Sequence, residues 1–597
     1  MPAGAWGARA GELLERVAER HGASVHRVGE LTMRSHPDAV RGDWCCWLWG
    51  APEDRGELAA RYDLQAAGDL PTAFARAFGE LGEGACELLQ GRFVLVAYDG
   101  ARDRCLVVRD QLGAQPLRHT HTADGVLFAE HERELLELLP HGPSPDRLAL
   151  LQWIDAGHTP AGRTLYEGIE RLPAGHRLVL DGRSVGVQRW WSLRYQGIEA
   201  GTEAVLAERL REAAFAAVKR ATAGFEHPVV KLSGGLDSAC VAAGLEAGGF
   251  ADGRALAIGG TFSAHPETDE RELIVATARH THLPLELVAF DPAGSMLAPA
   301  LAHIARWRLP PATPNLFVWQ PLMARARELG VELMLDGEGG DELFGLAPYL
   351  IADELRVGRL LSAWSLTGRL PGIAHHPDRG VRLRVLRHYG LAPLVPSAIQ
   401  RRRERARAGP PGSLVPRADA RALFDLDIAG RERRRDGPLW WRYLVETLID
   451  ERDLLDVGAH FRRESADEQL ERRHPLLYDL RLIEAVTRIP PRARFDPIRD
   501  RPLLREGLRG LIPEAVRTRH VKSHFSSVVL AGLRAEEAGL IEPLRRADAP
   551  IRAYVAAQAL QRRIGIAPDQ RSLLGAGGLW RVAIANRWLA AQAGAGS

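Results

Sequence analysis

The stretch Val229-Val230-Lys231-Leu232-Ser233-Gly234-Gly235-Leu236-Asp237-Ser238 carries most of the information about the fold. An apolar run typical of a buried strand ends in a glycine-rich turn, and a helical pattern follows over residues 239–245. Such a turn places backbone N–H groups and the positive end of a helix dipole where phosphate oxygens bind. Its glycines allow a ligand to approach closely, its serines add hydroxyl groups, and Asp237 offers a carboxylate to a cation.

A second glycine-rich turn, Asp336-Gly337-Glu338-Gly339-Gly340-Asp341-Glu342, follows another apolar run at residues 331–335. Mg²⁺ binds proteins through one or two carboxylates together with substrate phosphates, so we predict that Asp237 and Asp341 bind it from neighbouring strand ends. No Gly-Lys-Ser/Thr follows either turn, so neither is the phosphate loop of a kinase or GTPase. The residues predicted to contact ATP are Leu232, Ser233, Gly234, Gly235, Asp237, Ser238 and Gly337.

Together the two turns resemble the SGGxDS and GEGxDE motifs of the ATP pyrophosphatases of the asparagine synthetase superfamily. The resemblance implies an ATP-dependent amide ligase that cleaves ATP to AMP and pyrophosphate while it adenylates a carboxylate. It also implies a catalytic role for Glu338, which lies inside the second motif. The alternative for each turn is a strand-to-helix connection that binds no ligand.

Lysine is rare in this chain: only Lys219, Lys231 and Lys522 occur among 78 basic residues. An arginine-biased chain keeps lysine by chance or where a compact ammonium is hard to replace. Lys522 lies in residues 512–526, which resemble the segment in which a lysine of the synthetase family meets the acyl-adenylate. The resemblance implies that Lys522 is catalytic and stabilises the developing negative charge. Lys231 either contacts phosphate or extends from a strand end into solvent, and Lys219 is expected on a helix surface.

The composition is typical of a globular protein with several domains. The 597 residues are 46% apolar, 26% charged and carry a net charge of +2, which points to neither nucleic acid nor membrane. Runs such as Arg401-Arg402-Arg403 are interpreted as solvated faces. No apolar stretch has the length of a membrane span, and the N-terminus lacks a signal-peptide layout. Five cysteines without disulfide or metal spacing predict a reducing, cytoplasmic location.

Residues 1–200 are expected to form a β-rich domain of short strands separated by turns. Residues 91–99, 108–117 and 172–176 resemble the glutaminase half of asparagine synthetases, which implies an Ntn-hydrolase-like sandwich. Glutamine hydrolysis there needs a cysteine exposed by removal of the initiator Met. In this chain Pro2 follows Met1 and the nearest cysteine is Cys45. We therefore expect a degenerate domain without amidase activity, so that glutamine is not the nitrogen donor.

Residues 201–597 are expected to form the synthetase domain. Apolar runs at 229–232, 256–262, 285–290 and 331–335 alternate with helical patterns, which predicts a parallel sheet with its ligand at the carboxyl ends of the strands. The expected fold class is therefore α/β and α+β: a β-rich Ntn-hydrolase-like sandwich followed by an ATP-pyrophosphatase domain with helical extensions.

The helical, arginine-rich region 345–475 is expected to line the substrate cavity, with Gly409–Ser413 as a mobile loop. Its arginines either hold peptide carboxylates or merely solvate exposed helices. An amphipathic helix is expected to close the chain around residues 578–581.

The amine that reacts with the acyl-adenylate separates three branches that this chain resembles. Asparagine synthetases use ammonia, and β-lactam synthetases close a ring but typically carry tyrosine where this chain has Glu338. Lasso peptide cyclases adenylate an Asp or Glu side chain of a precursor peptide, which the N-terminal amine of the peptide attacks. The last resemblance is the favoured hypothesis, and it implies a precursor peptide, a leader peptidase and a leader-recognition protein as partners. A nucleotide-binding homologue without catalysis is the other alternative.

Overall fold

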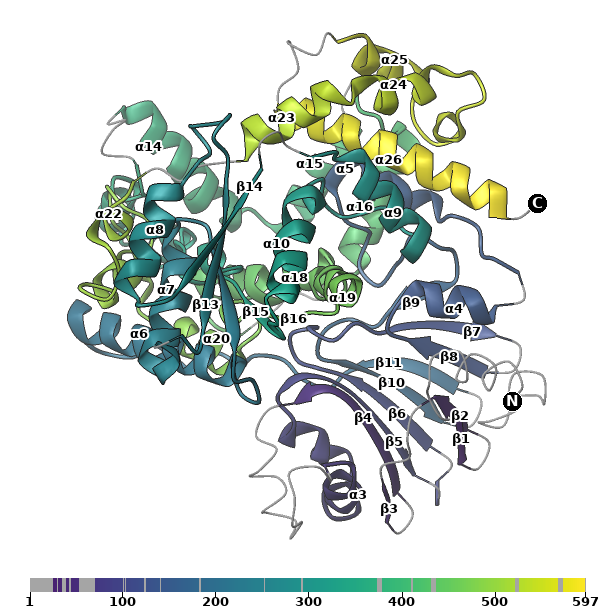
Figure 1. Ribbon diagram of the computed structural model, residues 1–597, viewed down its shortest axis with the longest axis horizontal. Helices are drawn as coiled ribbons and strands as arrows, with labels where there is room; N and C mark the ends of the chain where they lie inside the picture. Colours follow the sequence, from purple (N-terminus) through teal and green to yellow (C-terminus); the bar gives the residue numbers. More distant parts are fainter. Residues whose placement is uncertain are drawn as a thin grey trace.

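The computed structural model describes residues 25–28, 31–34, 39–41, 44–52, 70–99, 101–102, 104–122, 125–139, 141–181, 184–251, 253–290, 294–372, 378–409, 412–430, 436–520, 525–566 and 573–595. The described chain forms an antiparallel β part up to Arg189 and, from Glu203, a parallel sheet surrounded by helices (Figure 1). Residues 190–202 link the two parts without helix or strand. The expected fold class is confirmed, and the boundary expected at residue 200 stays a prediction.

The β part contains a six-stranded antiparallel sheet, β11-β10-β6-β5-β4-β3, a three-stranded sheet, β8-β7-β9, and the β1–β2 pair. Alternate side chains of β5 enter different cores: Phe93 and Leu95 pack with helix α3 (Leu70–Leu81), whereas Val94 and Val96 pack with Leu117. The strands are β1 (Val25–Val28), β2 (Leu31–Arg34), β3 (Ala39–Arg41), β4 (Trp44–Pro52), β5 (Gly91–Asp99), β6 (Arg104–Arg109), β7 (Arg118–Thr122), β8 (Gly125–Ala129), β9 (Ile169–Arg171), β10 (His176–Asp181) and β11 (Ser184–Arg189).

The second part is built on a five-stranded parallel sheet in the order β14-β13-β12-β15-β16. Val229 and Val230 are both fully buried but belong to cores on opposite faces, which explains the continuous apolar run of this strand. The strands are β12 (Pro228–Leu232), β13 (Leu256–Thr261), β14 (Leu285–Ala289), β15 (Leu333–Leu335) and β16 (Glu471–Arg473).

The strand order reverses beside β12. The chain leaves β12 through helix α7 (Leu236–Leu245) and returns as β13 on one side, whereas β15 pairs with the other side of β12. A parallel sheet opens a crevice at the carboxyl ends of its strands where the order reverses. Ser233 directly follows β12 and Asp336 directly follows β15, so the two glycine-rich turns meet at this crevice.

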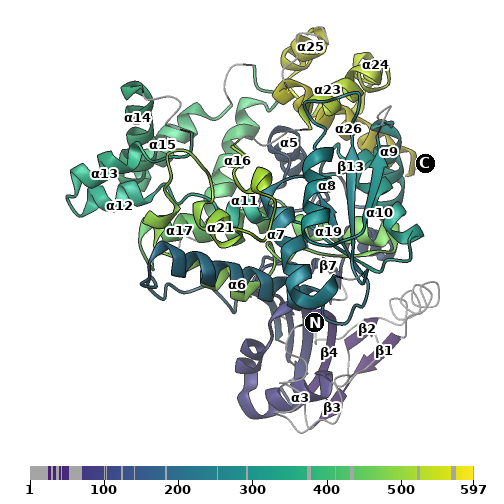
Figure 2. The same cartoon turned by 60° about the vertical axis from the view of Figure 1, so that its left-hand side comes forward.

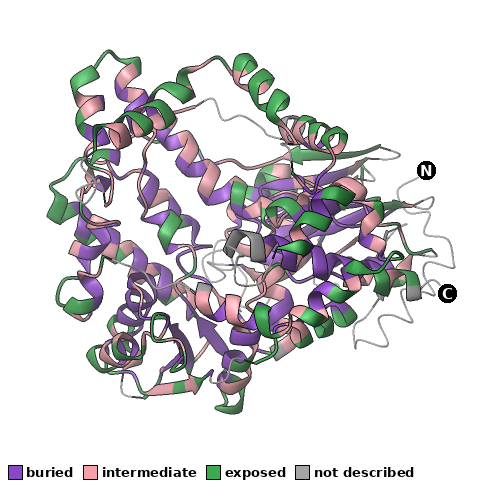
Figure 3. Ribbon diagram, turned by 90° about the horizontal axis from the view of Figure 1, so that it is seen from above, coloured by how far each residue is buried: buried purple, intermediate pink, exposed green. Residues whose placement is uncertain are grey.

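Helices surround the sheet, and the outer helices carry much of the exposed surface (Figures 2 and 3). Those of the first part are α3, α4 (Glu132–Leu138) and α5 (Arg147–Ala156). Those of the second part, besides α7, are α6 (Glu203–Ala221), α8 (Arg271–His280), α9 (Leu297–Trp307), α10 (Leu316–Glu328), α11 (Gly340–Leu343), α12 (Leu350–Arg356), α13 (Leu360–Thr367), α14 (Arg379–Val385), α15 (Ser397–Arg407), α16 (Arg417–Gly430), α17 (Leu439–Val445), α18 (Arg452–Leu454), α19 (Val457–Glu468), α20 (Leu480–Thr487), α21 (Pro502–Gly507), α22 (Glu514–Arg517), α23 (Ser526–Ala535), α24 (Glu537–Arg545), α25 (Ala557–Gly565) and α26 (Leu573–Ala595).

Buried arginines join the two parts of the chain. Arg109 donates from Nη1 to Asp453 Oδ1 at 2.9 Å, and Arg118 pairs with both Glu132 and Asp456. Next to Asp453, the side chain of Arg452 donates to the carbonyl oxygen of Gly339 at 3.0 Å. The β part is thus attached to the segment that supports the second glycine-rich turn.

The last helix, α26, differs from its expectation. Residues 578–589 are buried except for Arg581 and Arg587, which are intermediate, so this helix is not amphipathic. Its apolar side chains pack on all sides against other elements, among them α5, α9, α23 and α24. No helix among the described residues is long and apolar enough to cross a membrane.

Candidate active site

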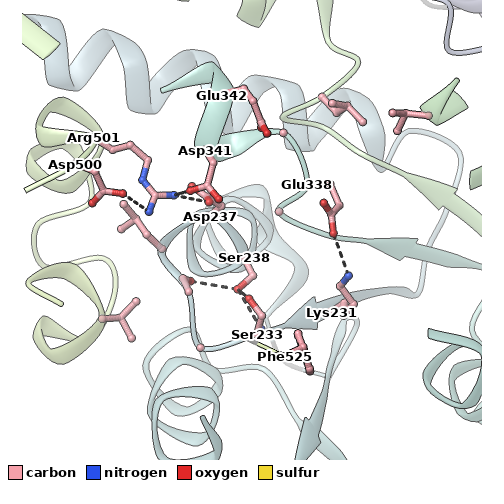
Figure 4. A pocket seen from close by; sticks show the side chains of 18 of the residues that line it. Lys231, Ser233, Asp237, Ser238, Glu338, Asp341, Glu342, Asp500, Arg501 and Phe525 are labelled. Carbon is pink, nitrogen blue, oxygen red and sulfur yellow. Dashed lines mark hydrogen bonds and ion pairs between the residues drawn. The ribbon is translucent and has the colours of Figure 1, made fainter. Parts of the chain in front are cut away.

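A cavity of about 490 Å³ opens at the carboxyl ends of β12 and β15 (Figure 4). Both glycine-rich turns line it, together with Glu270, which directly precedes α8, and side chains from α10, α18, α19 and the region around α21. The polar residues that line it include Lys231, Ser233, Asp237, Ser238, Glu270, Glu338, Asp341, Glu342, Glu451, Arg452, Asp500, Arg501, Arg505 and Arg519.

The first turn is held by its two serines. The backbone N–H of Ser233 donates to Ser238 Oγ at 3.2 Å, and the two hydroxyl groups lie 3.2 Å apart. Gly234 has a φ of +71°, a conformation that favours glycine. A Cβ there would lie 2.7 Å from Cβ of Glu270, so the turn also leaves no space for a side chain. The turn therefore presents backbone and hydroxyl groups at the start of α7.

The second turn packs directly on the first. A Cβ on Gly337 would lie 2.5 Å from the backbone nitrogen of Ser238, and a Cβ on Gly340 would lie 2.4 Å from Cγ of Asp237. Glycine is required at both positions because any side chain would push the two turns apart. The two motifs, which are far apart in sequence, are thus in direct contact in the folded protein.

Arg501 brings the two predicted metal ligands together. Its Nη1 lies 2.5 Å from Oδ2 of Asp237 and 2.7 Å from Oδ1 of Asp341, and its Nη2 lies 2.6 Å from Oδ2 of Asp500 (Figure 4). Burial opposes the charge of this guanidinium, but the three carboxylates outweigh it and raise the pKa of Arg501. Both carboxylates therefore point at one position that already attracts a cation.

This arrangement fits Mg²⁺. Two carboxylates converge on one point beside a turn suited to phosphate, which is the set of ligands that Mg²⁺ takes when substrate phosphates and water complete its shell. Among the described residues, no group of three or more His, Cys, Asp or Glu side chains forms a closed metal cage. Asp237 and Asp341 would hold the metal from the protein side.

Lys231 lies on the other side of the cavity. Its Nζ lies 3.7 Å from the centre of the Trp319 ring, 3.5 Å from Oε1 of Glu338 and 3.9 Å from Oδ2 of Asp336. The side chain is buried, so the ammonium points into the cavity and not out to bulk solvent. Of the two alternatives for this lysine, extension into solvent is wrong.

Asp336 organises the base of the second turn. It accepts a hydrogen bond from Arg472 Nη2 at 2.9 Å, and its Oδ1 lies 2.8 Å from Nδ1 of His474. Burial raises the pKa of the Asp336 carboxyl, but His474, Lys231 and Arg472 outweigh this effect and hold it well below its ordinary value. Asp336 is thus an ionised structural anchor, whereas the carboxylate of Glu338 is exposed.

The structure brings most of the predicted residues to one cavity. Ser233, Gly234, Gly235, Asp237, Ser238, Gly337, Glu338 and Asp341 line it. Leu232 does not, because its side chain is buried in the apolar core. Lys522 lies outside the described residues, and Lys219 is exposed on α6 as expected.

Sequence reasoning did not assign Trp319, Glu451, Asp500 or Arg519 to the site. Arg519 lies within residues 512–526, whose resemblance to the synthetase family points to the site. Arg501 also had a signal, because Arg501-Pro502-Leu503-Leu504-Arg505 resembles a KxLLR helix start of that family with the lysine replaced.

Comparison with known proteins agrees with this geometry. Residues 209–590 match the asparagine synthase family model, and residues 52–191 match that of the glutamine amidotransferase domain. The chain belongs to the asparagine synthase family, and it is an ATP-dependent amide ligase. The expected superfamily and enzyme class are confirmed.

Curated relatives are distant. Glutamine-hydrolyzing asparagine synthetase 3 of Bacillus subtilis (strain 168) is 23% identical over 497 residues, which cover 79% of this chain and 72% of the relative. A putative glutamine-hydrolyzing asparagine synthetase of Mycobacterium tuberculosis (strain H37Rv) is 27% identical over 345 residues, which cover 50% of this chain and 49% of the relative. A solved structure of glutamine phosphoribosylpyrophosphate amidotransferase from B. subtilis is 10% identical and covers 41% of this chain and 45% of its own, with a TM-score of 0.18, which is too low to carry an argument.

Proposed function

We propose that the two turns bind the phosphates of ATP and that Asp237 and Asp341 hold Mg²⁺ between them. The observation that carries this proposal is the contact between the two glycine-rich turns where the strand order reverses. Arg501 bridges the carboxylates of Asp237 and Asp341 there. Ser233, Gly234, Gly235, Ser238 and Gly337 contribute hydroxyl and backbone groups at the start of α7. Leu232 contributes only backbone atoms, because its side chain is buried. When bound, Mg²⁺ supplies positive charge against the phosphate oxygens.

The reaction proceeds in two substitutions. A substrate carboxylate attacks the α-phosphorus of ATP, which forms an acyl-adenylate and releases pyrophosphate. An amine then attacks the acyl carbon, which forms the amide bond and releases AMP. We assign to Lys522 the stabilisation of the charge that develops on the acyl oxygen and the leaving phosphate.

We assign to Glu338 the removal of the proton from the attacking amine. It is 44% exposed at the cavity, so a substrate can reach it, and the Nζ of Lys231 lies 3.5 Å from its Oε1. Glu342 and Glu451 line the same cavity, and all three carboxylates attract a cationic amine before it loses its proton. The cavity thus favours an amine nucleophile.

We further propose that the amine and the carboxylate belong to one peptide, so that the product is a macrolactam of the lasso type. The support is the resemblance of the motifs to lasso peptide cyclases and Glu338 in place of tyrosine. The proposed partners are a precursor peptide, a leader peptidase and a leader-recognition protein.

The test is mass spectrometry of a linear precursor peptide with its leader removed, incubated with ATP, Mg²⁺ and the enzyme. The peptide carries a free N-terminal amine and an Asp or Glu at about the eighth or ninth position, because the cavity must fold this segment while it excludes water. We expect loss of one water per peptide and one AMP per turnover. Lys522→Ala abolishes both, and Lys219→Ala, which removes an exposed lysine of α6, leaves them unchanged. An unchanged peptide mass with every precursor of this form would contradict the peptide assignment.

Asparagine formation is the second candidate, favoured by the names of the curated relatives. In that case AMP forms only when aspartate and free ammonia are supplied, and asparagine appears. The same assay, with those substrates in place of the peptide, separates the two functions.

A further inference from the structure

The helical region after the second turn carries charge out of proportion to the rest of the chain. Residues 356–407 contain twelve arginines and two acidic residues, a net charge of +10, whereas the whole chain carries +2. Helices α12 to α15 of this region form a lobe at the upper left of Figure 2. The rest of the chain therefore carries a net negative charge, whereas this segment is strongly basic.

Helix α15 is the most basic element of the lobe and buries none of its residues. Arg401 and Arg405 are four residues apart on it, as are Arg403 and Arg407, and such like-charged pairs destabilise a helix. Glu404 is its one acidic residue. A helix that is polar on all sides needs a covering surface or compensating charges to be stable. Within the described chain, α15 has little covering surface and few compensating acidic residues.

Between α15 and α16 lies a second cavity, of about 590 Å³. Its lining consists of Arg401, Arg402, Arg405, Ala406, Arg421, Phe424 and Asp425. Arg405 donates from Nη2 to Asp425 Oδ2 at 2.7 Å, which leaves three arginines of the lining without an ion pair to any described residue. Four guanidinium groups around one carboxylate repel each other, and an anion would relieve this repulsion.

Phe424 gives the cavity an apolar element among the guanidinium groups. Apolar side chains are also exposed elsewhere on the lobe: Leu391 and Leu394 precede α15, and Ile399 lies in its first turn. Gln400 of α15 donates from Nε2 to the carbonyl oxygen of Val395 at 3.0 Å, so the segment before α15 is attached to the basic helix. A ligand that fits must combine carboxylates with apolar side chains.

We propose that the α15–α16 cavity is a docking site for an acidic, amphipathic segment of another polypeptide. Its carboxylates pair with Arg401, Arg402 and Arg421, and one apolar side chain packs on Phe424. Arginine suits this task because its planar group binds carboxylates through two parallel hydrogen bonds. Binding at this cavity requires neither ATP nor the chemistry proposed for the active site.

A polypeptide segment fits better than a membrane or a nucleic acid. A membrane-binding helix needs a continuous apolar face, and α15 has none. A long polyanion would extend beyond the lobe onto a chain whose remaining charge is negative, and it would meet Asp425 inside the cavity. A short acidic segment avoids both conflicts.

The test measures fluorescence anisotropy of a labelled peptide of about fifteen residues in which glutamates alternate with leucines, the length of a short docked helix. We expect binding at about 0.15 M salt that weakens as salt is raised, because the contacts are ionic. Replacing the three unpaired arginines together (Arg401→Gln, Arg402→Gln, Arg421→Gln) is expected to weaken binding by about tenfold or more.

A charge-matched variant is the control. Arg403, Arg407 and Arg417 are exposed on the same two helices but do not line the cavity. Replacing these three with glutamine is expected to change the affinity by less than about threefold, since the loss of net charge alone is screened. Equal losses in both triple variants would overturn the proposal. Tighter binding of anionic phosphatidylglycerol vesicles or of single-stranded RNA than of the acidic peptide would also overturn it.

Discussion

Arg501 donates from Nη1 to Oδ2 of Asp237 at 2.5 Å, and through this contact the guanidinium takes the position expected for a cation. The two residues are 264 positions apart in sequence. Arg501 has a φ of +51° and immediately precedes α21, so its backbone has the left-handed conformation that is uncommon for arginine. The guanidinium group of Arg501 neutralises the carboxylates of Asp237 and Asp341, which are the predicted metal ligands.

Replacing Arg501 with glutamine is expected to make the protein more responsive to Mg²⁺. The carboxylates of Asp237 and Asp341 lose their bound guanidinium, so Mg²⁺ no longer competes with it. The rise in Tm on adding Mg²⁺ alone, without nucleotide, should be larger for Arg501→Gln than for the wild type. Adding Asp237→Asn to Arg501→Gln should remove the gain, and a gain that persists in this double variant would contradict the assignment.

Replacing either Asp237 or Asp341 with asparagine is expected to abolish ATP–pyrophosphate exchange without unfolding the protein. Asparagine keeps the size of the side chain but removes the negative charge that Mg²⁺ requires. Exchange of radiolabelled pyrophosphate into ATP reports only the first chemical step, in which the substrate carboxylate attacks ATP. The measurement therefore does not depend on the identity of the amine. Retained exchange in both variants, with normal circular dichroism, would refute the metal assignment.

Removing the buried Arg118 is expected to destabilise the protein strongly. Its guanidinium is fully buried between Glu132 and Asp456. Arg118→Met removes the short ion pair of each carboxylate and leaves only the longer contacts of Glu132 with Arg463, at 3.8 Å, and of Asp456 with Arg171, at 3.7 Å. Loss of one partner of a buried ion pair costs about 3–5 kcal/mol in the free energy of unfolding. Arg545→Ala, which breaks an exposed pair with Glu542, should cost less than about 1 kcal/mol. Urea denaturation measures both, and equal effects would show that the joint between the two parts contributes little.

Stability is expected to fall below pH 6.5 because of buried histidines. Burial lowers the pKa of His119 to about 4, and burial holds the pKa of His131 and His303 well below 6.5. These groups stay neutral in the folded protein while the unfolded chain takes up protons near pH 6.5. Each therefore removes at most about 1.4 kcal/mol per pH unit as the pH drops below that value.

His303→Leu tests this pH dependence, because neither ring nitrogen of His303 has a hydrogen-bond partner among the described residues. The free energy of unfolding, measured in urea at pH 7.5 and pH 5.5, should fall less in this variant than in the wild type. His227→Gln, at an exposed position, should keep the wild-type difference. An unchanged difference in His303→Leu would exclude this histidine as a cause.

The two glycine-rich turns could be predicted from the sequence because each is a local signal. An apolar run, closely spaced glycines and a helical pattern lie within about ten residues, and the backbone conformation of such a turn depends mainly on its own residues. The same holds for the strands expected at residues 229–232 and 256–262, which the structure confirms as β12 (Pro228–Leu232) and β13 (Leu256–Thr261). The prediction for the last helix is wrong because its surroundings, and not its own pattern, bury residues 578–589 almost completely.

Local patterns, together with the family resemblance of the two motifs, were thus sufficient for the fold class and the enzyme class, whereas the assignment of Asp237 and Asp341 as metal ligands stays a prediction. The roles of Arg501, Trp319 and Lys231 at the cavity depend on the folded chain. Trp319 belongs to α10 and Arg501 precedes α21, and neither position shows a spacing that relates it to β12. These contacts arise because the reversed strand order next to β12 collects segments from distant parts of the chain at one crevice. Packing of the whole chain sets which side chains reach that crevice, and a local sequence pattern carries no information about such long-range contacts.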